Sequence, residues 1–296
     1  MSVRNLVKSY GRLTAVDGVS FAIEPGEVFA LLGPNGAGKS TTIEILEGFR
    51  DRTSGSVEVL GVDPAGGGRA LRDRIGVVLQ QTGIELELTV REALEQYGAA
   101  YRSRRPADEL VELVGLDAKA DERITTLSGG QKRRVDLALG LVGDPDIVFL
   151  DEPTTGFDPS ARRESWELID RLAALGKTIL LTTHYLDEAQ HLADRVAVLQ
   201  SGRIIAEGTP QELTAQSPTR TVISFGPTPA IDATLAELGD RVRRTGQRIE
   251  VETESPTADL ALITTAAANQ NIELPALQVS RPSLEDVYLE LLGPAE

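Results

Sequence analysis

Apolar residues between Val3 and about Leu213 gather in short runs that alternate with helical patterns. Such an alternation predicts an α/β domain with a largely parallel sheet. Four runs are almost continuously apolar, which is typical of strands covered on both faces, and they lie at Val28–Leu32, 147–150, 178–182 and 196–199. Around Val57, Val59 and Leu60 apolar and polar residues alternate instead, as in a half-exposed strand. The pattern therefore predicts two kinds of sheet in the first part of the chain.

Two later segments depart from this alternation. Apolar positions recur at helical spacing between Leu88 and Leu141, so we expect a helical subdomain at about residues 82–141. A cluster of Ser, Pro and Gly at 217–229 predicts a domain boundary. We therefore assign residues 1–216 to one domain and residues 217–296 to a small α+β domain. The second domain is expected to have strands at Thr221–Phe225 and 249–252 and helices at 231–238, 259–269 and Leu284–Leu292.

Composition restricts the chemistry of the chain. Of the 296 residues, 41% are hydrophobic and 25% charged, as in ordinary globular proteins. The absence of cysteine and the presence of only two histidines, His184 and His191, exclude most zinc and iron centres but allow a cation with oxygen ligands, such as Mg²⁺. A net charge of −15 argues against a broad nucleic-acid footprint, and the basic clusters 102–105 and 132–134 are better explained as solvated surfaces. We therefore expect no nucleic-acid partner.

A glycine-rich segment after the strand Val28–Leu32 matches the phosphate-binding pattern GxxxxGK[ST]. A helical pattern follows at 41–46, which completes the strand, loop and helix context that the motif requires. The backbone N–H groups of such a loop and the helix N-terminus attract the phosphates of ATP. Lys39 is expected to reach the β- and γ-phosphates, and the Ser40 hydroxyl is expected to bind Mg²⁺. The ATP-binding residues predicted here are Gly33, Pro34, Asn35, Gly36, Ala37, Gly38, Lys39, Ser40 and Thr41.

Two carboxylates, Asp151 and Glu152, directly follow the apolar run 147–150. Ligands of open α/β sheets bind at the carboxyl ends of the strands. Asp151 is therefore expected to hold Mg²⁺, and Glu152 is free to accept a proton. Taken alone, the pair is equally explained by a helix N-cap or a solvated turn. The phosphate-binding pattern in the same chain favours the catalytic interpretation.

The pentapeptide Leu127-Ser128-Gly129-Gly130-Gln131 resembles the signature of ATP-binding cassette (ABC) ATPases. Physically, a serine and two glycines that open a helix provide a second anion-binding N-terminus. The resemblance implies a P-loop NTPase (RecA-like) cassette with an antiparallel β-subdomain and a helical subdomain. It also implies a dimer, because each ATP in this family lies between the phosphate loop of one subunit and the signature of another. A homodimer of this chain would have two complete sites.

Three further positions take roles from the same resemblance. Tyr10 is similar to the aromatic residue that stacks on adenine. Gln80, after a predicted strand at 75–79, is similar to the glutamine that touches Mg²⁺ and the attacking water, although the neighbouring Gln81 leaves this assignment open by one residue. His184, at the end of the run Thr178–Thr183, resembles the switch histidine that contacts the γ-phosphate.

Two other segments extend the resemblance. Asp158 lies in a segment, 156–158, that resembles the loop crossing the dimer interface, where the family more often has leucine in place of Phe157. Residues 282–289 resemble the end of an accessory domain in ATP-binding subunits of bacterial drug-resistance exporters, the daunorubicin-resistance type included. A Pro-Ser cap before an amphipathic helix explains the same residues without any family. Trp166, in a helical run at 162–175, is expected to contribute packing.

Together these resemblances imply an ATP-hydrolysing subunit of an ABC transporter that exports drugs or other hydrophobic compounds. No stretch approaches the roughly 18 apolar residues of a membrane-spanning helix, and the first thirty residues are charged where a signal peptide is apolar. We therefore expect the chain to lie peripherally on the cytoplasmic face of the cell membrane. Its integral membrane partner subunits would dock on the helical subdomain near Gln80. The alternatives are a non-transport ABC ATPase of DNA repair or translation, and a scaffold that binds ATP but scarcely hydrolyses it.

Overall fold

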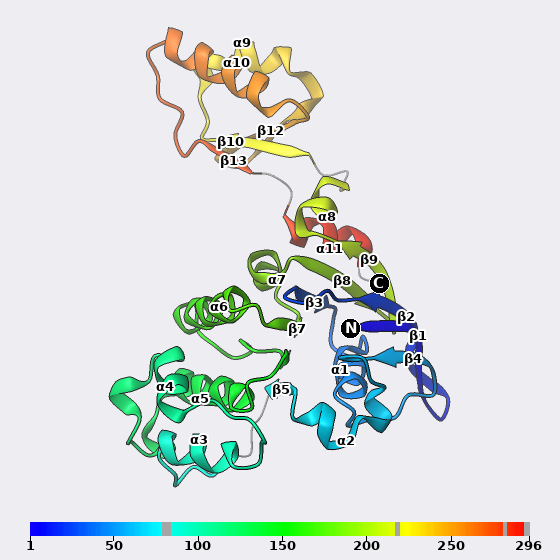
Figure 1. The fold of residues 1–296 in the computed structure, drawn as a ribbon. Helices are drawn as coiled ribbons and strands as arrows, with labels where there is room; N and C mark the ends of the chain where they lie inside the picture. The colour runs from blue at the N-terminus through cyan, green and yellow to red at the C-terminus, as the bar shows by residue number, and fades with distance from the viewer. Residues whose placement is uncertain (79–83, 217–219, 281–282, 293–296) are drawn as a thin grey trace. The chain divides into compact units, whose positions relative to one another are not determined.

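A computed structural model describes residues 1–78, 84–216, 220–280 and 283–292, shown as a ribbon in Figure 1. The chain forms two compact units, residues 1–210 and 211–296. The strands of the first unit are β1 Ser2–Tyr10, β2 Leu13–Ala22, β3 Val28–Leu32, β4 Ser54–Glu58, β5 Ile75–Val78, β6 Ile147–Asp151, β7 Thr178–Thr183, β8 Arg195–Gln200 and β9 Arg203–Gly208. Its helices are α1 Lys39–Leu46, α2 Pro64–Arg72, α3 Val90–Gly98, α4 Ala107–Leu113, α5 Gly129–Leu141, α6 Pro159–Ala174 and α7 Leu186–Leu192, and α8 Pro210–Gln216 follows.

The larger sheet of the first unit has the strand order β5-β6-β7-β3-β8-β9. Five strands run parallel, and β9 pairs with β8 in the antiparallel direction. Every residue of β3 and β7 is buried, as expected for strands covered on both faces. The near-continuous apolar runs of the sequence therefore predicted these strands correctly, whereas residue 79 of the predicted strand 75–79 lies outside the described residues.

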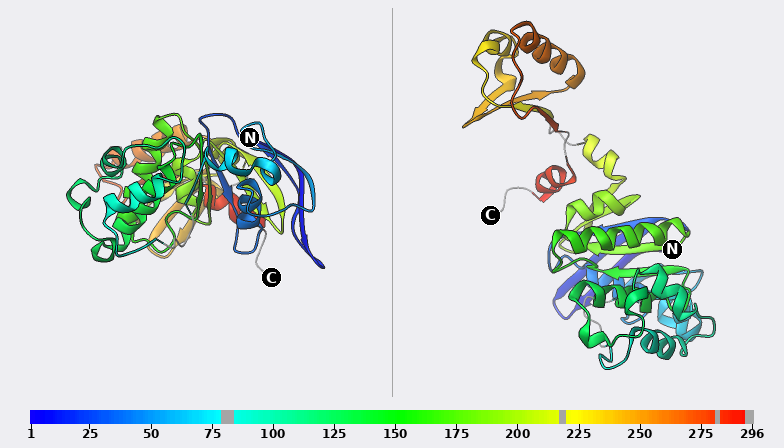
Figure 2. Two further views of the ribbon diagram at one scale, coloured as in Figure 1. Left: turned by 60° about the horizontal axis from the view of Figure 1, so that its bottom comes forward. Right: turned by 90° about the vertical axis from the view of Figure 1, so that its left-hand side faces the viewer.

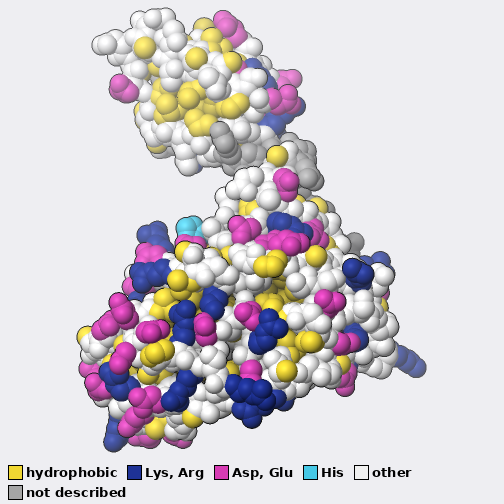
Figure 3. Space-filling view, in the orientation of Figure 1, with side chains coloured by type: hydrophobic (Ala, Val, Ile, Leu, Met, Phe, Trp, Pro, Cys, Tyr) yellow, Lys and Arg dark blue, Asp and Glu magenta, His cyan; other side chains and the backbone are white. Residues whose placement is uncertain are grey.

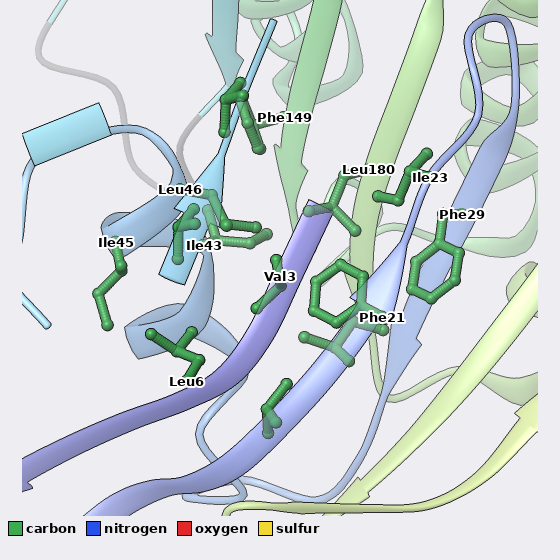
Figure 4. Packing of buried hydrophobic residues seen from close by; sticks show 14 of the residues in the cluster. Val3, Leu6, Phe21, Ile23, Phe29, Ile43, Ile45, Leu46, Phe149 and Leu180 are labelled. Atoms are coloured by element: carbon green, nitrogen blue, oxygen red, sulfur yellow. The ribbon is translucent and has the colours of Figure 1, made fainter. Parts of the chain in front are cut away.

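A second sheet, with the order β2-β1-β4, is antiparallel and confirms the predicted antiparallel subdomain. Side chains from this sheet, from α1 and from one face of the larger sheet share one core cluster. Figure 4 shows its packing, in which the rings of Phe21 and Phe29 stack with their centroids 5.2 Å apart. Burying each ring stabilises the fold by about 1.5–3 kcal/mol, so the core helps to hold α1 in place.

Between β5 and β6 the described chain contains α3, α4 and α5 and two short 3₁₀ turns, as expected for the helical subdomain. Two of these helices begin with reciprocal caps encoded in the sequence. The Thr89 hydroxyl accepts from the N–H of Glu92 at 3.2 Å, and the Glu92 carboxylate accepts from the N–H of Thr89 at 2.9 Å. Ser128 and Gln131 form the same arrangement at the start of α5. Such caps fix where a helix starts.

The second unit contains an antiparallel sheet with the order β11-β12-β10-β13. Its core residues alternate along the central strands, for example Ile223 and Phe225, and they face α9 and α10, which lie on one side of the sheet (Figures 1 and 2). The predicted helix 231–238 is shorter than expected, because a 3₁₀ turn at Pro229–Ile231 precedes it. The elements are β10 Thr221–Phe225, α9 Asp232–Glu237, β11 Val242–Thr245, β12 Arg248–Thr253, α10 Pro256–Asn269, β13 Gln278–Ser280 and α11 Leu284–Leu292.

No helix in the described parts of the chain combines the length and the apolar character needed to cross a bilayer. Acidic and basic side chains are interspersed over the face of residues 1–210 that Figure 3 shows.

Candidate active site

The phosphate-binding loop between β3 and α1 packs closely against the backbones of β2 and β8. A Cβ atom at Gly33 would lie 2.3 Å from the backbone oxygen of Leu199 in β8, and one at Gly38 would lie 2.4 Å from the backbone oxygen of Ala15 in β2. Gly38 also has a φ of 105°, which side chains with a Cβ rarely adopt. The close approach of β2 and β8 therefore requires glycine at both positions, in addition to any demand made by a bound phosphate.

Helix α1 begins directly after this loop, at Lys39, and Gly38 is its N-cap residue. No side chain in the described part of the chain caps its N-terminus. The first N–H groups of a helix have no partner within the helix and carry a partial positive charge. The Ser40 side chain is exposed and that of Thr41 is partly exposed, so both hydroxyls can be reached from outside. This end of α1 has the features of an anion site.

Lys39 places a buried ammonium group beside the loop and beside Glu152. Its side chain is only 5% exposed, and Nζ donates to the backbone oxygens of Gly33 at 2.7 Å and Pro34 at 3.3 Å. The same nitrogen lies 3.5 Å from Glu152 Oε1. Two neutral carbonyls and one carboxylate are thus the groups with which an incoming phosphate would compete for Lys39.

Glu152 follows β6 in a left-handed backbone conformation, with a φ of 47°. For a residue with a Cβ this costs about 1–2 kcal/mol, which the surrounding contacts must offset. Its N–H donates to the backbone oxygen and to Oγ1 of Thr182, both at 3.1 Å. On the other side, the Thr155 hydroxyl donates to Glu152 Oε2 at 3.0 Å. The carboxylate is therefore held in one orientation beside Lys39.

His184 and Asp151 complete the group. His184 follows β7, and its Nδ1 lies 3.4 Å from Glu152 Oε2. Asp151 Oδ1 accepts a 2.5 Å hydrogen bond from the Thr182 hydroxyl. The fold thus brings together Lys39, Asp151, Glu152 and His184, which are up to 145 residues apart in the sequence. The sequence predicts Thr182 only as part of a strand, because a threonine in an apolar run carries no signal of such a contact.

The signature residues lie at a different place in the same unit. Leu127 is buried, and Ser128, Gly129, Gly130 and Gln131 line a pocket of about 670 Å³ at the start of α5. Thr155, Gly156, Phe157 and Asp158 line the same pocket. In the described part of the chain no hydrogen bond joins the signature to the phosphate loop. One chain therefore brings the signature together with the segment 156–158 and not with Lys39.

Two polar residues of this pocket, Ser128 and Asp158, each cap a helix. The Ser128 hydroxyl oxygen accepts from the N–H of Gln131 at 3.3 Å, which leaves its proton free to be donated. The Asp158 carboxylate accepts from the N–H groups of Ser160 at 2.9 Å and Ala161 at 3.0 Å, at the start of α6. The capping role explains why Asp158 precedes a proline, since proline is favoured in the first helical turn.

Among the described residues, Tyr10 makes no hydrogen bond to the carboxylate group of Asp151 and Glu152. Tyr10, at the end of β1, is 40% exposed, with Lys8 Nζ 5.0 Å and the Arg50 guanidinium carbon 5.4 Å from its ring centroid. These cations polarise the ring and leave part of its surface accessible. Gln80 and Gln81 lie outside the described residues.

Glu47, at the end of α1, is a buried carboxyl group that the sequence analysis missed. It is 3% exposed, and neither of its oxygens has a hydrogen-bond partner among the described residues. Burial, with a smaller contribution from the nearby charges of Asp151 and Glu44, raises the pKa of Glu47 to about 8. The group is therefore predominantly neutral at pH 7. A glutamate after an apolar helical segment looks like a solvated helix end, so its burial could not be expected.

The fold and the group around Lys39 and Glu152 define a P-loop NTPase. In this class of protein the phosphate loop follows a central parallel strand, here β3, and acidic residues stand at the end of another strand of the same sheet, here β6. Two family models match the chain. The ABC transporter model covers residues 16–155, and a model of the C-terminal domain of ABC transporter domain-containing-like proteins covers residues 221–283.

Curated relatives match over almost the whole chain. The Nod factor export ATP-binding protein I of Paraburkholderia xenovorans is 43% identical over 293 residues, which are 97% of this chain and 94% of that protein. The protein of the same name from Neorhizobium galegae is 42% identical over 96% of this chain and 82% of its own length. The chain belongs to the family of ABC transporter ATP-binding proteins.

Solved structures agree with this fold. A dimeric, post-hydrolysis ATP-binding cassette bound to ADP and Pi is 28% identical, with a TM-score of 0.62 over 70% of this chain and 97% of its own. The cbiO1 protein of Clostridium perfringens, part of the ABC transporter complex cbiONQ, is 33% identical, with a TM-score of 0.66 over 73% of this chain and 90% of its own. The sequence prediction of an ABC cassette fold is thereby confirmed.

Proposed function

We propose that this chain binds ATP at residues 33–41 and hydrolyses it, with Glu152 as the general base, to drive export through separate membrane subunits. The observation that carries this proposal is the position of Glu152 between Lys39 and His184. Its Oε1 lies 3.5 Å from Lys39 Nζ, and its Oε2 lies 3.4 Å from His184 Nδ1. A cation for phosphate, a base for water and a second donor are thus adjacent at the carboxyl ends of the strands.

Binding uses the phosphate loop and the start of α1. The N–H groups of the loop and of the first helical turn hold the β- and γ-phosphates, and Lys39 exchanges its contacts with Gly33 and Pro34 for phosphate oxygens. Tyr10 stacks on the adenine ring through its exposed face. Stacking accepts any purine, so we expect weak selectivity for the base.

The residues present suit Mg²⁺, which takes one or two protein oxygens and otherwise keeps water and phosphate oxygens. Ser40 offers an exposed hydroxyl, and the Asp151 carboxylate lies at the end of β6 with one oxygen accepting from Thr182. No group of three or more acidic, His or Cys side chains suited to a metal occurs among the described residues. Gln80 is proposed as a further ligand. The ion would neutralise charge on the phosphates.

Hydrolysis is a displacement at the γ-phosphorus atom. Glu152 takes a proton from water as the water oxygen bonds to phosphorus, and the bond between phosphorus and the bridging oxygen of ADP breaks, which yields ADP and Pi. Lys39 and His184 stabilise the charge on the transferred group. The contacts of Glu152 with Thr155 and Thr182 keep the base in position, so catalysis depends on orientation and electrostatics.

A second cassette completes the site in our proposal. Ser128 retains a hydroxyl proton, and the N–H groups of Gly129 and Gly130 lie in the first turn of α5, so this helix end can donate to the γ-phosphate bound by another subunit. Asp158 in the same pocket would lie at the interface. A homodimer would have two such sites, and the dimeric state of the ADP-bound structural relative supports this arrangement.

Export through membrane partners is supported by the relatives named for Nod factor export. The finer proposal, export of drugs or other hydrophobic compounds of the daunorubicin-resistance type, is supported by residues 282–289 alone. The chain would lie on the cytoplasmic face of the membrane. A groove of about 530 Å³ between α2 and α3, lined by Arg69, Tyr97 and Tyr101 among others, is the docking place that we propose for a membrane subunit.

We also propose that residues 1–216 act as the cassette, that about 82–141 are its helical subdomain, and that residues 217–296 are an accessory domain. Both sheets of the first unit and the complete group around Glu152 lie within residues 1–210, which supports this division of labour.

The test combines hydrolysis with purification from membranes. Pi release by the full chain is compared with that of Lys39→Ala, and Lys119→Ala, an exposed lysine of the helical segment, serves as the control. We expect hydrolysis to be lost only in Lys39→Ala, and a multi-span membrane protein to co-purify with the wild-type chain. Equal hydrolysis in all three proteins would refute the assigned site, and recovery of nucleic acid or ribosomes in place of a membrane protein would refute export.

A further inference from the structure

A buried carboxylate behind the proposed catalytic group connects three separate elements. Glu188, in α7, is fully buried. Its Oε1 accepts from the Thr154 hydroxyl at 2.7 Å and from Trp166 Nε1 of α6 at 3.1 Å. Burial raises the pKa of Glu188, and the hydrogen bonds from Thr154 and Trp166 oppose this by favouring the charged form. One side chain therefore joins α7, α6 and the segment after Glu152.

One partner of Glu188 lies close to the proposed base in the sequence, because Thr154 is two residues after Glu152. Thr154 is fully buried, so its hydroxyl has no access to water as an alternative partner. Loss of the acceptor at Glu188 would leave this hydroxyl unsatisfied, and the segment would have to shift to find another.

Such a shift would act directly on Glu152. The left-handed conformation of Glu152 is strained, and it persists only because contacts on both sides hold the chain. Thr182 holds the N–H of Glu152, whereas the Thr154–Glu188 bond holds the backbone that follows. Arg133 of α5 adds a buried contact, from Nε to the backbone oxygen of Pro153 at 3.1 Å. With the bond to Glu188 removed, Glu152 can relax away from its place beside Lys39 and His184.

We propose that Glu188 is a positioning residue for hydrolysis, which holds Glu152 in place beside Lys39 and His184 through its hydrogen bond with Thr154. This inference rests on the proposed function and extends it to a residue that touches neither nucleotide nor water. The described contacts of Glu188 do not include the phosphate loop, so it affects the catalytic step and leaves ATP binding unchanged.

The experiment uses the full chain and measures kcat for Pi release separately from the dissociation constant for ATP. Glu188→Leu removes the acceptor at similar volume, Glu188→Gln keeps an acceptor oxygen without the charge, and Thr154→Val removes the donor. Glu167→Leu, an exposed carboxylate next to Trp166, is the matched control. Trp166 is the only tryptophan, and its indole donates to Glu188, so its emission in each variant reports whether the unit is folded and whether the contact is kept.

We expect Glu188→Leu to lower kcat by about tenfold or more with an ATP dissociation constant within about twofold of wild type. Glu188→Gln should keep kcat within about threefold. The double variant with Thr154→Val should be no slower than the slower single variant, because both changes break one bond. Glu167→Leu should match wild type.

Two outcomes would overturn the inference. One is a folded Glu188→Leu variant with wild-type kcat, and the other is a loss of ATP affinity that accounts for the whole loss of activity. If Glu188→Leu does not fold, Thr154→Val is tested in its place, and a wild-type kcat in Thr154→Val would likewise overturn the inference. Absence of hydrolysis in the wild-type chain would contradict the proposed function itself and is recognised before any variant is compared.

Discussion

Glu47 allows a direct test of how a buried, unpaired carboxyl group affects stability. The change is Glu47→Gln, which keeps the shape of the side chain and removes its ability to ionise. In the folded chain, burial and the charges of Asp151 and Glu44 raise the pKa of Glu47 from 4.5 to about 8. The unfolded chain has no such environment, so its glutamate ionises near the ordinary value.

The sign and size of the effect follow from proton binding. Between pH 4.5 and about 8 the folded protein holds a proton on Glu47 that the unfolded protein has released, so the free energy of unfolding falls as the pH rises. The slope is about 1.4 kcal/mol per pH unit, and over the whole window of about 3.5 units the loss is about 5 kcal/mol. Glu47→Gln abolishes this contribution, so its advantage over wild type grows with pH.

Denaturant unfolding followed by Trp166 emission measures this difference, because the only tryptophan lies in the same unit as Glu47. Measurements between about pH 5.5 and 8 avoid the pI of about 4.7, and over this range we expect the variant to gain about 3 kcal/mol on wild type. A difference in the free energy of unfolding that the amide group causes equally at every pH does not alter this trend. If the free energies of unfolding of the two proteins depend on pH in the same way, Glu47 is not held neutral by burial.

Three further predictions concern the proposed site and the division of the chain. Gly33→Ala should destabilise the first unit by about 1–3 kcal/mol, because its Cβ would collide with the Leu199 backbone. Gly66→Ala is the control, since its Cβ would have no neighbour within 4 Å, and equal melting temperatures of the two variants would contradict the packing argument. Glu152→Gln should retain ATP binding but accumulate a closed, ATP-bound dimer, seen by size-exclusion chromatography, and unchanged hydrolysis would exclude Glu152 as the base. A chain that ends near Gln216 should still bind ATP in a fluorescent-nucleotide titration while assembly changes, and loss of all binding would argue against two separable domains.

The buried parts of the fold could be predicted from the sequence, and the exposed edges could not. The strand Val28–Leu32 is predicted with its observed bounds because every residue in it is apolar and buried. No bounds were predicted for β1, β2, β9, β11 or β13. In β11, for example, Arg243 and Arg244 are exposed and leave no apolar run to recognise. At such edges, pairing with a neighbour decides the conformation, and a single sequence does not show the neighbour.

The candidate site was predictable as far as local motifs extend. The phosphate loop, Asp151 and Glu152 were chosen because each stands in a recognisable strand context, and their proximity follows from the parallel sheet. Their roles in catalysis remain predictions. Thr182 and Glu188 were missed, because their function depends on contacts with residues about 30 positions away. Such residues are recognised by their neighbours in the folded structure, because the spacing of residues along the sequence does not reveal these contacts.

The position of β3 in the sheet affects the order in which the protein can fold during synthesis. Phe29 pairs with Arg195 in β8, 166 residues later, and its other neighbour, β7, begins only at Thr178. At about 5–20 residues per second, the ribosome needs roughly 8–33 s to supply the second partner after β3 has been made. Throughout this interval an apolar strand lacks its native neighbours and is exposed to aggregation. We therefore expect this strand to remain exposed to aggregation until almost the whole first unit has been translated.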